Sequence, residues 1–100
     1  MDEEEIAKDV AKKLGIPYAC FANRILKMQD GQHLESIIPE NFARDNLVMP
    51  LFLDGETLAV AMAEPSKQLT DLVRLISGQA IQPFVSSKTQ LLTAIDRFYP

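Results

Sequence analysis

Apolar and polar positions along the first segment of this chain repeat with a helical period. Within residues 2–14, Ile6, Val10 and Leu14 recur every fourth position, which places them on one stripe of an α-helix with two alanines beside it. The acidic residues that open the segment suit the positive end of a helix dipole. Gly15 is a natural stop, and a proline follows it closely, so the pattern predicts a helix over residues 2–14.

The clearest signal lies in residues 47–63, where two apolar runs flank Asp54-Gly55. Such runs predict a β-hairpin with a type I′ turn, in which the glycine supplies the positive φ. In the second run bulky aliphatic residues alternate with alanines, so we expect both faces to be buried, with a helix packed closely on the alanine face. Pro50 cannot donate a ladder hydrogen bond, which predicts that the first strand lies at an edge or is unpaired on one side there.

The remainder of the chain predicts two helices separated by a strand. The first helix spans residues 66–77, and its apolar positions fill the i, i+3, i+4, i+7 template: Leu69, Leu72, Val73 and Ile76. A strand is expected over residues 80–85. A helix over residues 87–99 follows, beginning with Ser87 and Gln90 in capping-box spacing.

The stretch between the first helix and the hairpin is the least regular part of the sequence. Residues 18–21 are expected to be extended, and residues 22–32 to form a surface loop that contains the turn signal Asp30-Gly31. A short helix is predicted to follow, with Pro39 at its first position.

These elements predict an α+β fold in a single domain, residues 1–100. The simplest architecture is a three-stranded sheet, made of the hairpin plus one strand, covered by three to four helices. The strand, helix and strand between residues 56 and 85 are expected to form a right-handed crossover. One hundred residues suffice for one core and would leave two cores marginal.

Charge and cysteine content narrow the class of partner. The formal net charge is −4, and four of the acidic residues lie in the segment from Asp2 to Glu5. The ten acidic residues that remain equal the ten Lys and Arg, which are scattered, so neither a nucleic-acid-binding stripe nor a lipid-binding basic cluster is expected. One cysteine cannot form an internal disulfide, and no apolar run is long enough to span a membrane. We therefore expect a cytoplasmic location.

The sequence contains few residues that could perform catalysis. A single histidine and a single cysteine cannot supply the ligands of a typical zinc site, and Cys20, beside Phe21, is expected to be buried and inert. There is no Gly-x-x-x-x-Gly-Lys-Ser/Thr phosphate loop and no Gly-x-Gly-x-x-Gly motif. We therefore predict a non-catalytic domain with no catalytic, cofactor-binding or metal-binding residues.

The loop contains the one group of residues that we expect near a partner surface: Arg24, Lys27, Met28 and His33. Apolar side chains between Arg24 and Met28 occur in a segment without a regular period. They either cover the core or expose apolar surface to a partner.

Five phrases in order resemble the N-terminal domain of type II secretion and type IV pilus assembly ATPases. They span Lys13–Tyr18, Ile37–Glu40, Val48–Phe52, Leu58–Pro65 and Ile81–Val85. The positions that carry the family pattern are Gly15, Pro17, Pro39, Pro50, Gly55, Met62, Pro65, Gly78 and Pro83. The chain departs from the pattern in a longer stretch between Pro17 and Pro39, and in Glu64, where the family usually has aspartate.

The resemblance implies a regulatory module that precedes an ATPase core and contacts the cytoplasmic part of an inner-membrane partner of the machine. Its association with the membrane would then run through that partner. Some members of the family bind cyclic di-GMP through upstream Arg-Leu-Gly repeats, and this chain contains no Arg-Leu-Gly. The alternatives are a domain that senses cyclic di-GMP or another nucleotide, and the same module on a signalling protein.

Overall fold

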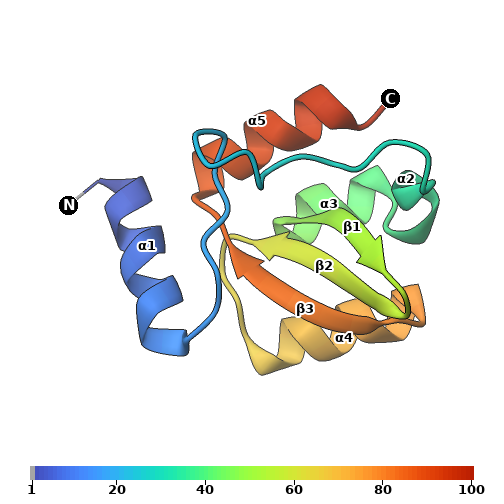
Figure 1. Cartoon of the computed structure of the whole chain (residues 1–100), viewed down its shortest axis with the longest axis horizontal. Helices are drawn as coiled ribbons and strands as arrows, with labels where there is room; N and C mark the ends of the chain where they lie inside the picture. Colours follow the sequence, from blue (N-terminus) through green and yellow to red (C-terminus); the bar gives the residue numbers. More distant parts are fainter. Residues whose placement is uncertain (1) are drawn as a thin grey trace.

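Figure 1 shows the computed structural model, which describes residues 2–100 as an α+β fold built on one mixed sheet. The elements in order are α1 (Glu3–Leu14), α2 (Leu34–Ile37), α3 (Glu40–Asn46), β1 (Val48–Asp54), β2 (Thr57–Met62), α4 (Lys67–Ser77), β3 (Ala80–Val85) and α5 (Lys88–Phe98). The predicted fold class and three-stranded sheet are confirmed. The one-turn helix α2 is additional, since no helix was predicted before Pro39 in this stretch.

The sheet has the order β1-β2-β3, with β1 antiparallel and β3 parallel to the central strand β2. Each edge strand carries a proline, Pro50 in β1 and Pro83 in β3, which suits edges because proline cannot donate a ladder hydrogen bond. Beside Pro50 the β1 register slips by one residue, so that Leu51 has no cross-strand partner. The predicted edge position of the first strand is confirmed.

The hairpin turn differs from the predicted one. Asp54 pairs with Thr57, so the turn consists of Gly55 and Glu56 and not of Asp54 and Gly55. Among the described residues, Gly55 has a positive φ of 63° and Glu56 does not. A type I′ turn requires positive φ at both positions, so the type I′ prediction was wrong and the turn follows the type II′ pattern.

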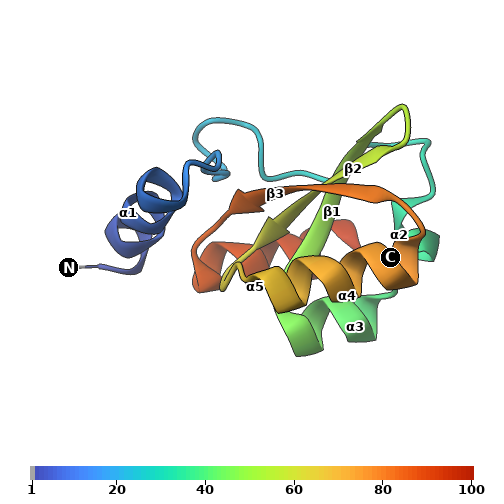
Figure 2. The same cartoon turned by 90° about the horizontal axis from the view of Figure 1, so that it is seen from below.

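Three helices cover one face of the sheet, and an irregular segment runs along its edge. Figure 2 shows α3, α4 and α5 on one side of the sheet, and Figure 1 shows the chain between α1 and α2 passing beside β1. The predicted helix against the alanines of β2 is absent at Ala59, where strand residues alone line a shallow hollow. The rings of Phe52 and Phe84 meet edge to face there, with centroids 6.3 Å apart. Because alanine is small, aromatic side chains from the two edge strands occupy the space that was assigned to a helix.

The outer helix α1 begins where it was predicted and contacts the domain through small side chains. Ala7 and Ala11 are buried and form a small cluster with Val85, whereas Ile6 and Leu14 are 50% and 56% exposed. The helix is as predicted, and the residues that it buries are the alanines beside the stripe. Two alanines allow the helix backbone to approach β3 closely, which the bulkier stripe would prevent.

Two helix starts also depart from their predicted geometry. Pro39 is the N-cap of α3 and not its first residue. The Ser87 hydroxyl caps α5 by accepting the Gln90 N–H, but the Gln90 side chain accepts the distant Phe21 N–H, so the capping box is only half formed.

Within residues 2–100 no helix has the length and apolar composition needed to cross a membrane.

Candidate protein-interaction surface

The loop predicted to lie at a partner surface divides into buried and exposed side chains. Met28 is buried in the main core, as is Leu26 beside it. Arg24, Lys27 and His33 are exposed. The apolar residues of this loop therefore cover the core, and its cationic side chains and its histidine are the ones available to a partner.

Hydrogen bonds hold this loop against the edge strand β1. The Gln29 N–H donates to the Leu51 carbonyl over 2.8 Å. The Gln32 amide pairs with both backbone groups of Leu53, donating to its carbonyl at 3.1 Å and accepting its N–H at 2.8 Å. These contacts satisfy part of the free edge of β1, so the loop acts as a partial fourth strand.

A second set of contacts fixes the other end of the loop. The Asn23 side-chain oxygen accepts the N–H groups of Cys20 and Ile25, at 3.0 and 3.1 Å. The guanidinium of Arg97 in α5 lies 4.8 Å from the centre of the Phe21 ring, a cation–π contact. The exposed side chains of the loop therefore project from an anchored backbone.

An exposed apolar surface that the sequence pattern did not predict lies on α4, and it includes Leu75, the most exposed large apolar side chain of residues 2–100. The helix is well capped, since the Ser66 hydroxyl accepts the Leu69 N–H and Gly78 ends the helix with a φ of 70°. Of its apolar residues Val73 alone is fully buried. We call the exposed set Leu72, Leu75 and Ile76 the α4 surface; Leu75 is 79% exposed.

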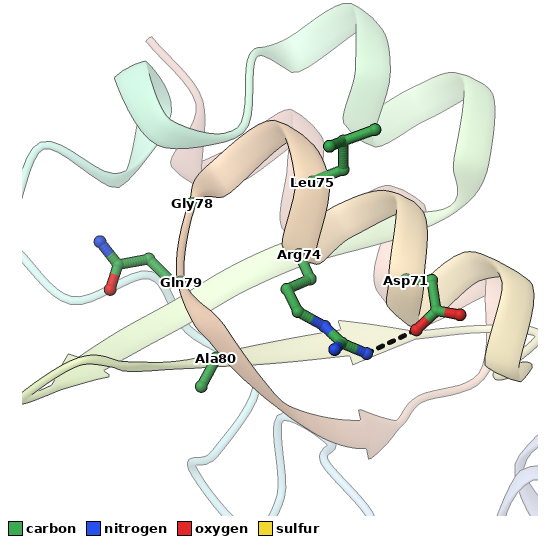
Figure 3. A pocket seen from close by; sticks show the side chains of 6 residues that line it. All are labelled: Asp71, Arg74, Leu75, Gly78, Gln79 and Ala80. Atoms are coloured by element: carbon green, nitrogen blue, oxygen red, sulfur yellow. Dashed lines mark hydrogen bonds and ion pairs between the residues drawn. The ribbon is translucent and has the colours of Figure 1, made fainter.

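The charges beside the α4 surface neutralise each other. Arg74 forms an ion pair with Asp71 one turn away, and Leu75 points from another side of the helix (Figure 3). A hollow lined by these three residues with Gly78, Gln79 and Ala80 continues to the start of β3. The surface is thus apolar with no unpaired charge in the hollow, which suits contact with a protein more than with an ion.

A signal for this surface was present in the sequence. Leu75 lies outside the i, i+3, i+4, i+7 set and widens the apolar stripe of α4. The apolar spacing therefore predicts the helix but not which of its apolar side chains are exposed.

Two ionisable side chains, Tyr99 and Arg44, join separate elements of the fold. Burial raises the pKa of the Tyr99 hydroxyl above its usual range, and this hydroxyl donates to the Ile38 carbonyl over 2.6 Å. The pKa of Arg44 is raised by its hydrogen bonds to Asp96 and Glu40, which link α5 to α3. Residues 2–100 contain no group of three or more His, Cys, Asp or Glu side chains placed to bind a metal ion.

Comparison with known proteins was made on sequence and on structure. The family model of the MshEN domain matches residues 14–100. A curated relative, the type IV pilus assembly ATPase PilB of Myxococcus xanthus (strain DK1622), is 26% identical over 100 residues that cover 99% of this chain. The chain spans only 17% of the length of that relative.

Two solved structures share the fold. The N-terminal domain of XpsE superposes with a TM-score of 0.84 at 20% identity, over 99% of this chain and 68% of that chain. MshE with cdg (cyclic di-GMP) superposes with a TM-score of 0.81 at 19% identity, over 99% of this chain and 70% of that chain.

Proposed function

This chain belongs to the MshEN domain family, found as the N-terminal domain of type II secretion and type IV pilus assembly ATPases, and we propose that it docks such an ATPase onto its machine. The partner in this proposal is the cytoplasmic domain of an inner-membrane component of the same secretion or pilus system. Hydrolysis of ATP belongs to another part of the parent protein, because this chain lacks a phosphate loop.

The observation that carries the proposal is the exposure of the α4 surface. Three large aliphatic side chains lie together on one helix, and the one ion pair beside them is closed within the helix. Such a face matches recognition of an apolar groove by an amphipathic helix. Burying one leucine of this kind stabilises a complex by about 1.5–3 kcal/mol before the costs of association are counted.

We place a second contact, of different chemistry, on the loop. Arg24, Lys27 and His33 project from its anchored backbone and suit an acidic segment of a partner, while Met28 supports them from the core. The loop lies along the β1 edge of the sheet and α4 lies toward the β3 edge (Figure 1), so a single small partner domain would not contact both. The α4 surface is the principal contact in this proposal.

The proposal is tested by calorimetric titration of this chain with the cytoplasmic domains of the inner-membrane components of its own system. Leu72→Gln combined with Leu75→Gln is expected to weaken binding at least about tenfold, because two apolar contacts are lost. Gln82→Ala, at an exposed position of β3 outside the α4 surface, is the control and should bind as wild type. Unchanged affinity of the double variant would contradict docking through the α4 surface. Measurable ATP hydrolysis by the chain would contradict its non-catalytic role.

Cyclic di-GMP sensing is the second candidate function. The similarity of fold to MshE with cdg favours it, whereas the absence of Arg-Leu-Gly from this chain weighs against it. Titration of the purified chain with cyclic di-GMP separates the two functions, since docking alone predicts no heat of binding.

A further inference from the structure

Helix α1 leaves its larger apolar side chains unburied. Ile6 and Leu14 are exposed and Val10 is half-buried, although the three lie on one stripe at a spacing of four residues. The body of the domain contacts Ala7 and Ala11 instead. A stripe of this length on a helix surface normally packs against another element.

The stripe forms one wall of a groove. Ile6 and Val10 line a hollow whose opposite wall includes Glu64 and Pro65. Leu14 lines a second hollow that also includes Pro65. Pro65 lines both hollows, which between them take in α1 residues from Glu3 to Leu14.

The charge of this groove changes sign from one end to the other. The first turn of α1 carries exposed acidic residues, and Glu64 lies in the hollow beside that turn. The last turn carries Lys12 and Lys13, and Lys67 lies in the second hollow. Among the residues that line the acidic hollow the one cation is Lys88.

We propose that a second copy of this chain occupies the groove, with its α1 antiparallel to the first and a two-fold axis near Val10. The stripe is self-complementary in this arrangement, because Ile6 meets the partner subunit's Leu14 and Leu14 meets the partner subunit's Ile6. The acidic end of each helix then lies beside the basic end of the other. A parallel arrangement would place like charges together at both ends.

This inference goes beyond the proposed docking function and uses a different surface. The groove reaches α4 only at its first turn, through Lys67 and Thr70, and the α4 surface lines neither hollow. Figures 1 and 2 show α1 itself at one end of the molecule. Dimerisation through α1 therefore leaves the α4 surface of each copy free, and failure of either idea does not affect the other.

The first test is the molar mass of the full chain by sedimentation equilibrium across a range of protein concentrations. A monomer–dimer equilibrium that weakens as salt is added is expected, because the end charges are exposed. Leu14→Gln should raise the dissociation constant roughly tenfold or more, since the symmetry removes two leucine contacts. Leu75→Gln, the same change at an exposed leucine of α4, is the matched control and should leave the dimer unchanged.

A monomeric mass at every concentration would overturn the proposal, as would a dimer that Leu75→Gln breaks and Leu14→Gln does not.

Disulfide trapping tests the orientation in a Cys20→Ala background, which removes the native thiol. The Ile6→Cys and Leu14→Cys variants should each remain uncrosslinked alone and crosslink when mixed. Efficient crosslinking of either variant with itself, with none gained on mixing, would contradict the antiparallel arrangement.

Discussion

At the scale of single residues, the Gln32 side chain makes the hydrogen bonds to β1 that a neighbouring strand would make. Its amide oxygen and nitrogen pair with the N–H and carbonyl of Leu53, the two groups that a neighbouring strand would otherwise satisfy. The Gln32 side chain thus joins the loop to β1. The sequence did not predict this contact, because it shows only a polar residue after the turn signal Asp30-Gly31.

Replacement of this side chain should loosen the loop. Gln32→Ala is expected to lower the free energy of unfolding by about 1–2 kcal/mol, because two partly buried backbone groups lose their partner. The measurement is urea-induced unfolding. Gln29→Ala is the control, since Gln29 uses its backbone N–H to bind Leu51 and the substitution keeps that bond. Equal destabilisation by the two variants would show that the Gln32 amide has no special role.

The buried Tyr99 hydroxyl predicts how stability responds to alkaline pH. Burial raises the Tyr99 pKa above its unfolded value, so the folded state keeps the proton that the unfolded state releases. Stability is then fully present below about pH 10 and falls as the pH rises further, by about 1.4 kcal/mol per pH unit for one such group. Tyr99→Phe should lower the stability at neutral pH, because the Ile38 carbonyl loses its donor, and should make the alkaline decline shallower. Parallel pH profiles of the two proteins would contradict this assignment.

At the scale of elements, α1 shows what periodicity predicts and what it leaves open. The spacing of Ile6, Val10 and Leu14 correctly predicted a helix, because it depends on the sequence alone. Which face of the helix is buried depends on how closely the helix can approach β3, and the alanines permit the closest approach. The same limit applies at β2, where the alternation predicted burial of both faces but not that aromatic rings would cover the alanines.

One carboxylate connects α1 to α5. Both Glu3 oxygens accept hydrogen bonds from Thr89, one from its N–H and one from its hydroxyl, each over 2.7 Å. These bonds lower the pKa of the Glu3 carboxyl. The stability that they contribute is therefore present above the ordinary glutamate pKa and is lost as the pH falls through the lowered value.

Glu3→Gln should accordingly speed hydrogen exchange in α1 and leave the amides of β2 unaffected. The reason is that α1 otherwise contacts the domain through a small cluster of its own. Glu5→Gln makes the same change of charge at an exposed position of the same turn and is the control. Uniform acceleration across the sheet would indicate global destabilisation and would contradict a local tether.

At the scale of the whole molecule, the local signals that agreed with one another predicted the architecture. The hairpin pattern and the strand, helix and strand that follow it place β1, β2 and β3 in one sheet, as observed. The interaction surface was harder to predict, because exposure is set by the packing of the complete domain. Met28 and Leu75 illustrate this: the first lies in a loop and is buried, and the second lies on an amphipathic helix and is exposed.

The docking account makes its most direct prediction about where a partner protects this chain. Hydrogen–deuterium exchange is measured with and without the cytoplasmic domain of the inner-membrane component that binds. The account predicts slower exchange in the partner-bound state over α4, residues 67–77, with little change in α1. Protection confined to other elements, with α4 exchanging as in the free chain, would contradict docking through the α4 surface.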